Sequence, residues 1–194
     1  DVNVPFFTYE GGSNFECVKF KLKQNESIDA DAGCMNYMSC CIKISTKTGN
    51  LTDAFGRLFS GSSFFYNSFT NKSKDNGNIN LSSINPGNIG AFFIPKGKSL
   101  NLISDSYICS TPNLRITTNV KFGGFLLGYG LTFVHIEATE SNGVVWISSF
   151  GNIIEKKIKP NDSIKIDNGI IIGFDRKITW NSYLTFYFKR FGVL

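Results

Sequence analysis

The stretch NGVVWISSFGNII, residues 142–154, decides the fold of this chain. Its apolar run is rich in β-branched and aromatic residues, and an Asn-Gly and a Gly-Asn turn bound it, so the pattern predicts a β-strand. Alternation places Val145 and Ile147 on one face and Val144 and Trp146 on the other. Neither face is polar. We therefore expect both faces to be covered, with Trp146 buried away from solvent.

The same pattern occurs earlier in the chain, as NGNINLSSINPGNI at residues 76–89. A second echo occurs three times, from Asn25, Gly97 and Asn161, and each copy has a polar turn, a Ser with an aliphatic residue after it, another turn and a new apolar run. Many short strands without a convincing helix predict an all-β protein, either a β-sandwich, a jelly roll or a double-stranded β-helix. The spacing of about 65 to 70 residues predicts duplication of a half-domain rather than a solenoid.

The duplication predicts two pseudo-repeats in one compact unit. We expect an N-terminal arm at residues 1–14, a first β half-domain at 15–90, a second at 91–181 and a C-terminal strand or tail at 182–194. The sequence contains no run of about 20 apolar residues, so we expect no transmembrane helix. Because the chain begins at Asp1 without Met, a targeting segment upstream would not be visible.

The net charge and the cysteine content say less about the protein than the strand pattern does. The net charge of +5 is spread along the chain, which favours a solvated surface over binding to nucleic acid or lipid headgroups. The five cysteines are odd in number and lack the paired spacing of zinc or redox sites. We expect reduced, mostly buried thiols in an intracellular compartment.

The search for chemistry centres on His135, the single histidine. It shares a strand face with Phe133 and Glu137, so a His-Glu pair is possible. One histidine without organised cysteines argues against a metal site, and no GxSxG motif is present. The Gly-rich run at residues 123–130 lacks the ending of a phosphate-binding loop. The sequence therefore predicts no catalytic, cofactor-binding or metal-binding residues and no enzyme. A cupin-like enzyme that uses His135 and Glu137 is a remaining hypothesis.

A series of short motifs carries a family resemblance. In chain order they are Met-Xaa-Tyr-Met-Ser at 35–39, Phe-Ser-Gly-Xaa-Ser-Phe-Phe at 59–65, Pro-Gly-Asn-Ile at 86–89, Gly-Gly-Phe-Leu at 123–126, Ser-Phe-Gly-Asn-Ile-Ile at 149–154 and Ile-Asp-Asn-Gly at 166–169. In this order and spacing the sequence resembles the altered inheritance of mitochondria protein twenty-four family, also called the mitochondrial biogenesis family, over residues 15–181.

The resemblance implies a fold like that of the tryptophan RNA-binding attenuation protein. Two such β-domains, each a short double-stranded β-helix, would be fused in one chain, and three chains would form a homotrimer with pseudo-sixfold symmetry. The resemblance implies no established catalytic activity and no family active-site residues. Where the family commonly has Gly-Asn after Met-Ser, this chain has Cys40-Cys41, so we expect a strand in place of a turn-like site.

The leading functional hypothesis is a non-enzymatic, oligomeric β-scaffold without a cofactor. The resemblance implies that it supports mitochondrial inner-membrane organisation, with a membrane-organising protein as its partner, in a mitochondrial location if the protein is eukaryotic. The alternative is a module that binds RNA or a small ligand in the manner of the attenuation protein. The sequence makes nucleic acid the less favoured partner.

Overall fold

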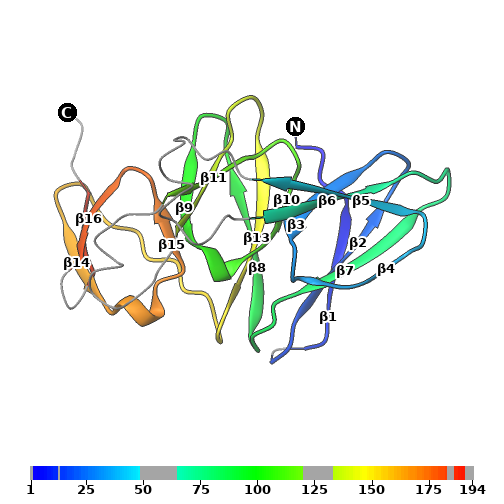
Figure 1. Cartoon of the computed structure of the whole chain (residues 1–194). Coiled ribbons are helices and arrows are strands. Elements are labelled where there is room, and N and C mark those ends of the chain that lie inside the picture. Colours follow the sequence, from blue (N-terminus) through cyan, green and yellow to red (C-terminus); the bar gives the residue numbers. More distant parts are fainter. Residues whose placement is uncertain (1, 13, 49–64, 120–132, 183–185, 191–194) are drawn as a thin grey trace.

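The computed structural model describes residues 2–12, 14–48, 65–119, 133–182 and 186–190. Within these ranges the protein is nearly all β, with its strands in four antiparallel sheets and two short 3-10 helices, η1 (Ser104–Ser106) and η2 (Asn168–Ile170) (Figure 1). The predicted all-β class is confirmed. In the described part of the chain, no helix is long and apolar enough to cross a membrane.

Each sheet is defined by its strand order. The first sheet has the order β1-β2-β7-β4, the second β5-β6-β3-β10-β13-β8, the third β11-β12-β9-β15 and the fourth β14-β17-β16. The strands are β1 (Phe6–Glu10), β2 (Cys17–Leu22), β3 (Ser27–Asp31), β4 (Met35–Met38), β5 (Ile42–Thr48), β6 (Phe65–Asn71), β7 (Gly77–Ser82), β8 (Asn88–Ile94), β9 (Ser99–Ile103), β10 (Tyr107–Ser110), β11 (Arg115–Asn119), β12 (Phe133–Glu137), β13 (Gly143–Ser149), β14 (Ser163–Ile166), β15 (Gly173–Asp175), β16 (Ile178–Ser182) and β17 (Phe186–Arg190).

Three hydrophobic cores lie between successive sheets. The first core joins the first and second sheets, the second core joins the second and third, and the third core lies between the third sheet and the fourth. The elements run across Figure 1 in the same order, from β1 and β2 on the right to β14 and β16 on the left. The chain is therefore a stack of β layers in which each inner sheet has a core on both faces.

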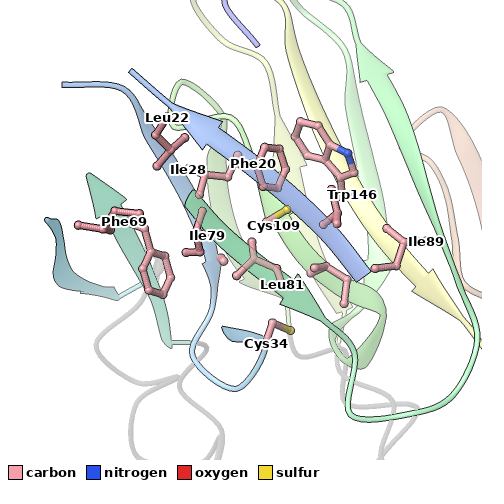
Figure 2. Packing of buried hydrophobic residues seen from close by; sticks show 14 residues of the cluster. Phe20, Leu22, Ile28, Cys34, Phe69, Ile79, Leu81, Ile89, Cys109 and Trp146 are labelled. Carbon is pink, nitrogen blue, oxygen red and sulfur yellow. The ribbon is translucent and has the colours of Figure 1, made fainter. Parts of the chain in front are cut away.

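Strand β13 separates the first two cores, as its sequence predicts. Trp146 belongs to the first core and Val144 packs against that core, whereas Val145 and Ile147 belong to the second. The Trp146 side chain is fully buried beside Phe20 and close to Cys109 (Figure 2). The Phe20 ring meets the indole edge to face, with the ring centroids 4.8 Å apart. The expectation that this strand is covered on both faces is confirmed.

One arrangement of three paired strands occurs three times in the described part of the chain. The order β5-β6-β3 of the first repeat (residues 17–82) recurs as β11-β12-β9 in the second (88–149) and as β16-β17-β14 in the third (153–190). The trio β2-β7-β4 recurs as β8-β13-β10. Both β4 and β10 even carry a β-bulge at the same place, between Met35 and Tyr37 and between Tyr107 and Cys109.

Neighbouring repeats are joined by main-chain pairing. Strand β3 of the first repeat pairs with β10 of the second, and β9 of the second pairs with β15 of the third. The six-stranded second sheet is therefore half first repeat and half second. Residue 90, at which the sequence analysis divides two half-domains, lies inside β8, and the third copy of the echo forms β14 to β16.

Two local expectations have clear outcomes. The expected N-terminal arm contributes a strand, because β1 pairs along β2 in the first sheet. The expectation of a strand at Cys40-Cys41 is wrong, since both residues lie in a turn in which the Ile42 N–H donates to the Ser39 carbonyl at 3.0 Å. Neither cysteine has a positive φ, so this turn does not require the Gly-Asn that the family commonly has. The Gly-rich segments at 56–61 and 123–130 lie outside the described residues.

Candidate functional site

His135 lies on β12, on the face that points towards the third repeat. Phe133 at the start of this face belongs to the third core, while Glu137 at its end is partly exposed. His135 lies between them and is 9% exposed. The face therefore passes from apolar core to solvent within five residues, and the imidazole sits at the rim of the third core.

The imidazole is held in one orientation by a neighbouring strand. Asn101 on β9 and Thr117 on β11 are its cross-strand neighbours, and His135 Nδ1 lies 2.9 Å from Asn101 Oδ1. An amide oxygen only accepts, so this bond places the proton on Nδ1 and leaves Nε2 as an acceptor. Burial is the largest cause that lowers the pKa of His135, and the positive charges of Arg176 and Arg115 lower it further against the opposing effect of Glu137.

Two arginines complete this rim, and the sequence analysis missed both as site residues. Arg115 is the cross-strand neighbour of Glu137, and Arg176 follows β15 with its guanidinium 3.9 Å from the Glu137 carboxylate. The backbone N–H of Arg176 also donates a hydrogen bond to the backbone carbonyl of Ser99 at 3.4 Å. Arg115 occupies the position in the second repeat that Lys43 occupies in the first, so a basic residue at this position in both repeats was the available sequence signal for Arg115. Arg176 comes from a different repeat, so no local pattern indicated its position.

The predicted His-Glu pair is only partly assembled. His135 and Glu137 share a face, but no hydrogen bond joins their side chains among the contacts of the described residues. Across the described ranges, no group of three or more His, Cys, Asp or Glu side chains is arranged to hold a metal ion. We refer below to Asn101, Arg115, Thr117, His135 and Arg176 as the rim cluster.

The first repeat has an equivalent cluster at its junction with the second. Asp29 is the counterpart of Asn101 and is 1% exposed. Lys47 Nζ lies 3.2 and 3.1 Å from the two Asp29 carboxylate oxygens, and the lysine also lies over the Tyr66 ring at 5.9 Å. Ser68, the counterpart of His135, is buried too. This junction cluster therefore has a buried carboxylate, paired with a lysine, at the position where the rim cluster has a neutral amide.

The thiols offer little chemistry. All five cysteines are free, with Cys34 and Cys109 buried, Cys17 and Cys41 partly buried and Cys40 exposed. Burial raises the pKa of Cys34 to about 12 and raises that of Cys109 well above its usual range. Such thiols stay protonated and are poor nucleophiles. Two of the five thiols are buried, so the expectation that most of them are buried is met only in part.

Two open sheet edges lie at the ends of the repeat array. Strand β4 is the last strand of the first sheet and pairs only with β7 among the described strands, whereas its counterpart β10 is flanked by both β13 and β3. Among the described residues, strand β14 pairs only with β17, whereas its counterparts β3 and β9 have a strand on each side. The edge of β4 thus lacks a neighbour of the β3 type, and the edge of β14 lacks a neighbour of the β4 type.

Comparisons with known proteins agree with this architecture. Residues 7–187 match the family model described as Mitochondrial biogenesis AIM24. An X-ray crystal structure of a protein from Streptococcus pyogenes is similar in fold, with a TM-score of 0.73 and 18% sequence identity over 97% of this chain and 90% of that one. Among curated protein sequences, none matches the chain.

Proposed function

Because the chain belongs to the mitochondrial biogenesis AIM24 family, we propose that it is a non-enzymatic scaffold that assembles head to tail with further copies of itself. The family description links it to mitochondrial biogenesis, and the proposed setting is the organisation of the mitochondrial inner membrane, with a membrane-organising protein as partner. The proposed size is a homotrimer with an attenuation-protein-like arrangement of its repeats. The open edges of β4 and β14 are the observation that carries the proposal.

Inside the chain, each junction is made by adding a β4-type strand to a β3-type strand. Cys109 pairs with Ala30 at the first junction, and Phe174 pairs with Asn101 at the second. A third junction of this kind requires β14 of one copy and β4 of the next. An exposed strand edge presents unpaired N–H and C=O groups, so pairing of these two edges would satisfy them in the geometry that the protein already uses twice.

The side chains at the two edges are compatible with this junction. Tyr37 on β4 is 50% exposed and corresponds to Cys109, which is fully buried between repeats. On β14, Ile166 corresponds to Ala30. The proposed junction therefore covers Tyr37 with Ile166 of the neighbouring copy. Such a contact is heterologous, so it closes into a ring or continues as a filament according to the rotation between copies.

Light scattering during size-exclusion chromatography tests the proposal. The wild-type chain is expected to elute as a multiple of the monomer, and Tyr37→Asp to elute as a monomer, because the new carboxylate would be buried between two strands. Thr46→Asp is the matched control, since Thr46 is exposed on β5, an edge outside the proposed junction. A monomeric wild-type protein at micromolar concentration would overturn the proposal, as would a Tyr37→Asp variant that keeps both the wild-type mass and circular dichroism spectrum.

The charge distribution favours one second candidate, an RNA-binding module. The third repeat, residues 153–190, contains eight Lys or Arg and four Asp or Glu, so it carries most of the net charge of +5. Binding to phosphate backbones is strongly salt-dependent. This candidate predicts a mobility shift with RNA that disappears between 50 mM and 200 mM salt. A protein that shows no shift even at low salt does not have this function.

A further inference from the structure

We propose that the rim cluster is a binding site for the phosphate group of a phosphorylated ligand. The site would use the guanidinium groups of Arg115 and Arg176 and the imidazole of His135, with Asn101 and Thr117 as positioning residues. The inference does not depend on the oligomeric scaffold, because every residue in it belongs to one chain.

The first argument is the register of the third sheet. Arg115 and Thr117 on β11 are directly opposite Glu137 and His135 on β12, and Asn101 on β9 is opposite His135 from the other side. Directly paired side chains on one face lie about 5 Å apart at their Cβ atoms. Three strands therefore bring a guanidinium, a hydroxyl, an imidazole and an amide together on one surface.

The second argument is that these cations lack strong partners. No described residue accepts a hydrogen bond from the Arg115 guanidinium, and Arg176 has only the loose 3.9 Å contact with Glu137. His135 is buried by nine-tenths and its Nδ1 is hydrogen-bonded to Asn101, and its Nε2 is not among the described buried polar atoms that lack a partner. The Arg115 guanidinium has no described carboxylate within 4 Å, although Glu137 is its cross-strand neighbour, and it is the cation of the cluster that a ligand would engage.

The third argument is the contrast with the junction cluster of the first repeat. There, the carboxylate of Asp29 occupies the position of Asn101 and binds Lys47 within the chain. In the second repeat the same position holds a neutral amide, and the carboxylate that approaches a cation of the cluster is that of Glu137, 3.9 Å from the Arg176 guanidinium. The junction cluster pairs its cation with a buried carboxylate, whereas Arg115 of the rim cluster has no described carboxylate within 4 Å.

The side chains of the rim cluster have the chemistry of a phosphate-binding site. Guanidinium groups offer planar pairs of donors that match phosphate oxygens, and an imidazole that takes up a proton adds a further charged donor. A bound phosphate would therefore oppose the causes that lower the pKa of His135. The carboxylate that would oppose phosphate binding is that of Glu137, which the Arg176 guanidinium approaches at 3.9 Å.

Because His135 is the only histidine, its imidazole signals in an NMR spectrum are assigned without ambiguity. The full chain is titrated with inorganic phosphate and with pyrophosphate, against sodium chloride at matched ionic strength. The expected result is a saturable shift of the His135 signals and a raised pKa of His135. Arg115→Gln and Arg176→Gln are each expected to weaken the binding about tenfold, and Glu137→Gln to strengthen it.

Lys43→Gln is the matched control, since Lys43 occupies the position of Arg115 in the first repeat. It is expected to leave the titration unchanged. Asn101→Asp copies the junction cluster and is expected to abolish the saturable shift. Vesicles that contain phosphatidate, compared with free phosphate, distinguish a lipid headgroup from a soluble phosphate ester. The proposal is overturned if phosphate, pyrophosphate and vesicles move the His135 signals no more than chloride does, or if both arginine variants bind as the wild type does.

Discussion

Asn80 in the first repeat and Trp146 in the second occupy the same place in their repeats. Each lies in the central strand of its trio, opposite Lys19 and Tyr37 in the first repeat and opposite Ala91 and Cys109 in the second. The backbone environment is alike, down to the bulge in the neighbouring strand. The side chains are not, because Trp146 belongs to the first core whereas Asn80 lies on the outer face of the first sheet.

The difference teaches how one repeat adapts to its position in the array. On the outer face, Asn80 receives a hydrogen bond from Asn36 at 2.8 Å and donates to Glu10 at 3.2 Å, and Glu10 also pairs with Lys19. In the second repeat this network is replaced by an indole that Phe20 and Phe7 cover. A face that an adjacent repeat covers becomes apolar, and the first face of the array stays polar, as in the end repeats of solenoid proteins.

The strongest test of this comparison is truncation of both residues. Trp146→Ala is expected to lower the free energy of unfolding by about 3 to 5 kcal/mol, because it opens a cavity in a fully packed core. Asn80→Ala is expected to cost about 1 to 2 kcal/mol, since it removes the two hydrogen bonds that the buried Asn80 amide makes with Asn36 and Glu10. Urea denaturation followed by circular dichroism measures both values. Equal losses in the two variants would show that the two faces are energetically equivalent, contrary to the comparison.

The junction clusters give the next largest effect. Lys47→Met leaves the Asp29 carboxylate buried without its cation and is expected to cost about 1 to 3 kcal/mol, reduced by solvent screening because the Lys47 side chain is 41% exposed. Adding Asp29→Asn replaces the buried carboxylate with a neutral amide, the group that Asn101 supplies in the second repeat, and is expected to recover most of the loss. The double variant is compared with both single variants in the same denaturation assay. A double variant that is less stable than Lys47→Met would contradict the proposed equivalence.

A change of pH is expected to have a smaller effect on the free energy of unfolding. The pKa of His135 is lower in the folded chain than its ordinary value of 6.5, so the unfolded chain binds the proton more readily. Stability is therefore complete above about pH 6.5 and falls as the pH drops from there through the folded pKa. His135→Gln is expected to remove this part of the pH dependence, measured as the unfolding midpoint between pH 7.5 and pH 5. Identical pH profiles for variant and wild type would remove His135 as the cause.

The last test is thiol labelling, which compares the buried Cys109 and Cys34 with the exposed Cys40. In the folded protein, a thiol reagent is expected to modify the exposed Cys40 at least about 100-fold faster than Cys109 or Cys34, which react only through unfolding. Mass spectrometry of the labelled peptides gives the order of reaction, and Cys40→Ser is the control that removes the fast phase. Early labelling of Cys109 would mean that the first core is open on the timescale of the assay.

Much of this architecture could be predicted from periodicity. Alternation in residues 144–147 assigned each side chain to the correct core, and the echoes identified strands that the structure shows to be equivalent, including β7 with β13. The turn at Cys40-Cys41 was predicted wrongly, because the expectation compared residue types with a family pattern and did not consider whether the turn needs a positive φ. The candidate site was predicted only in part. His135 and Glu137 were identified from one strand, but the two arginines come from other strands.

The sequence by itself determined the strands, their two-faced burial and the repetition of one unit, because these properties depend on residues close together in the chain. The tertiary structure alone decided which repeat meets which. It brought β3 beside β10 and β9 beside β15, placed Lys47 on Asp29, and placed Arg176 at the rim of His135. These contacts join segments far apart in the sequence, and their geometry depends on how the whole stack of sheets packs. For the same reason the sequence predicted that Trp146 would be covered, but only the fold shows that the first repeat covers it.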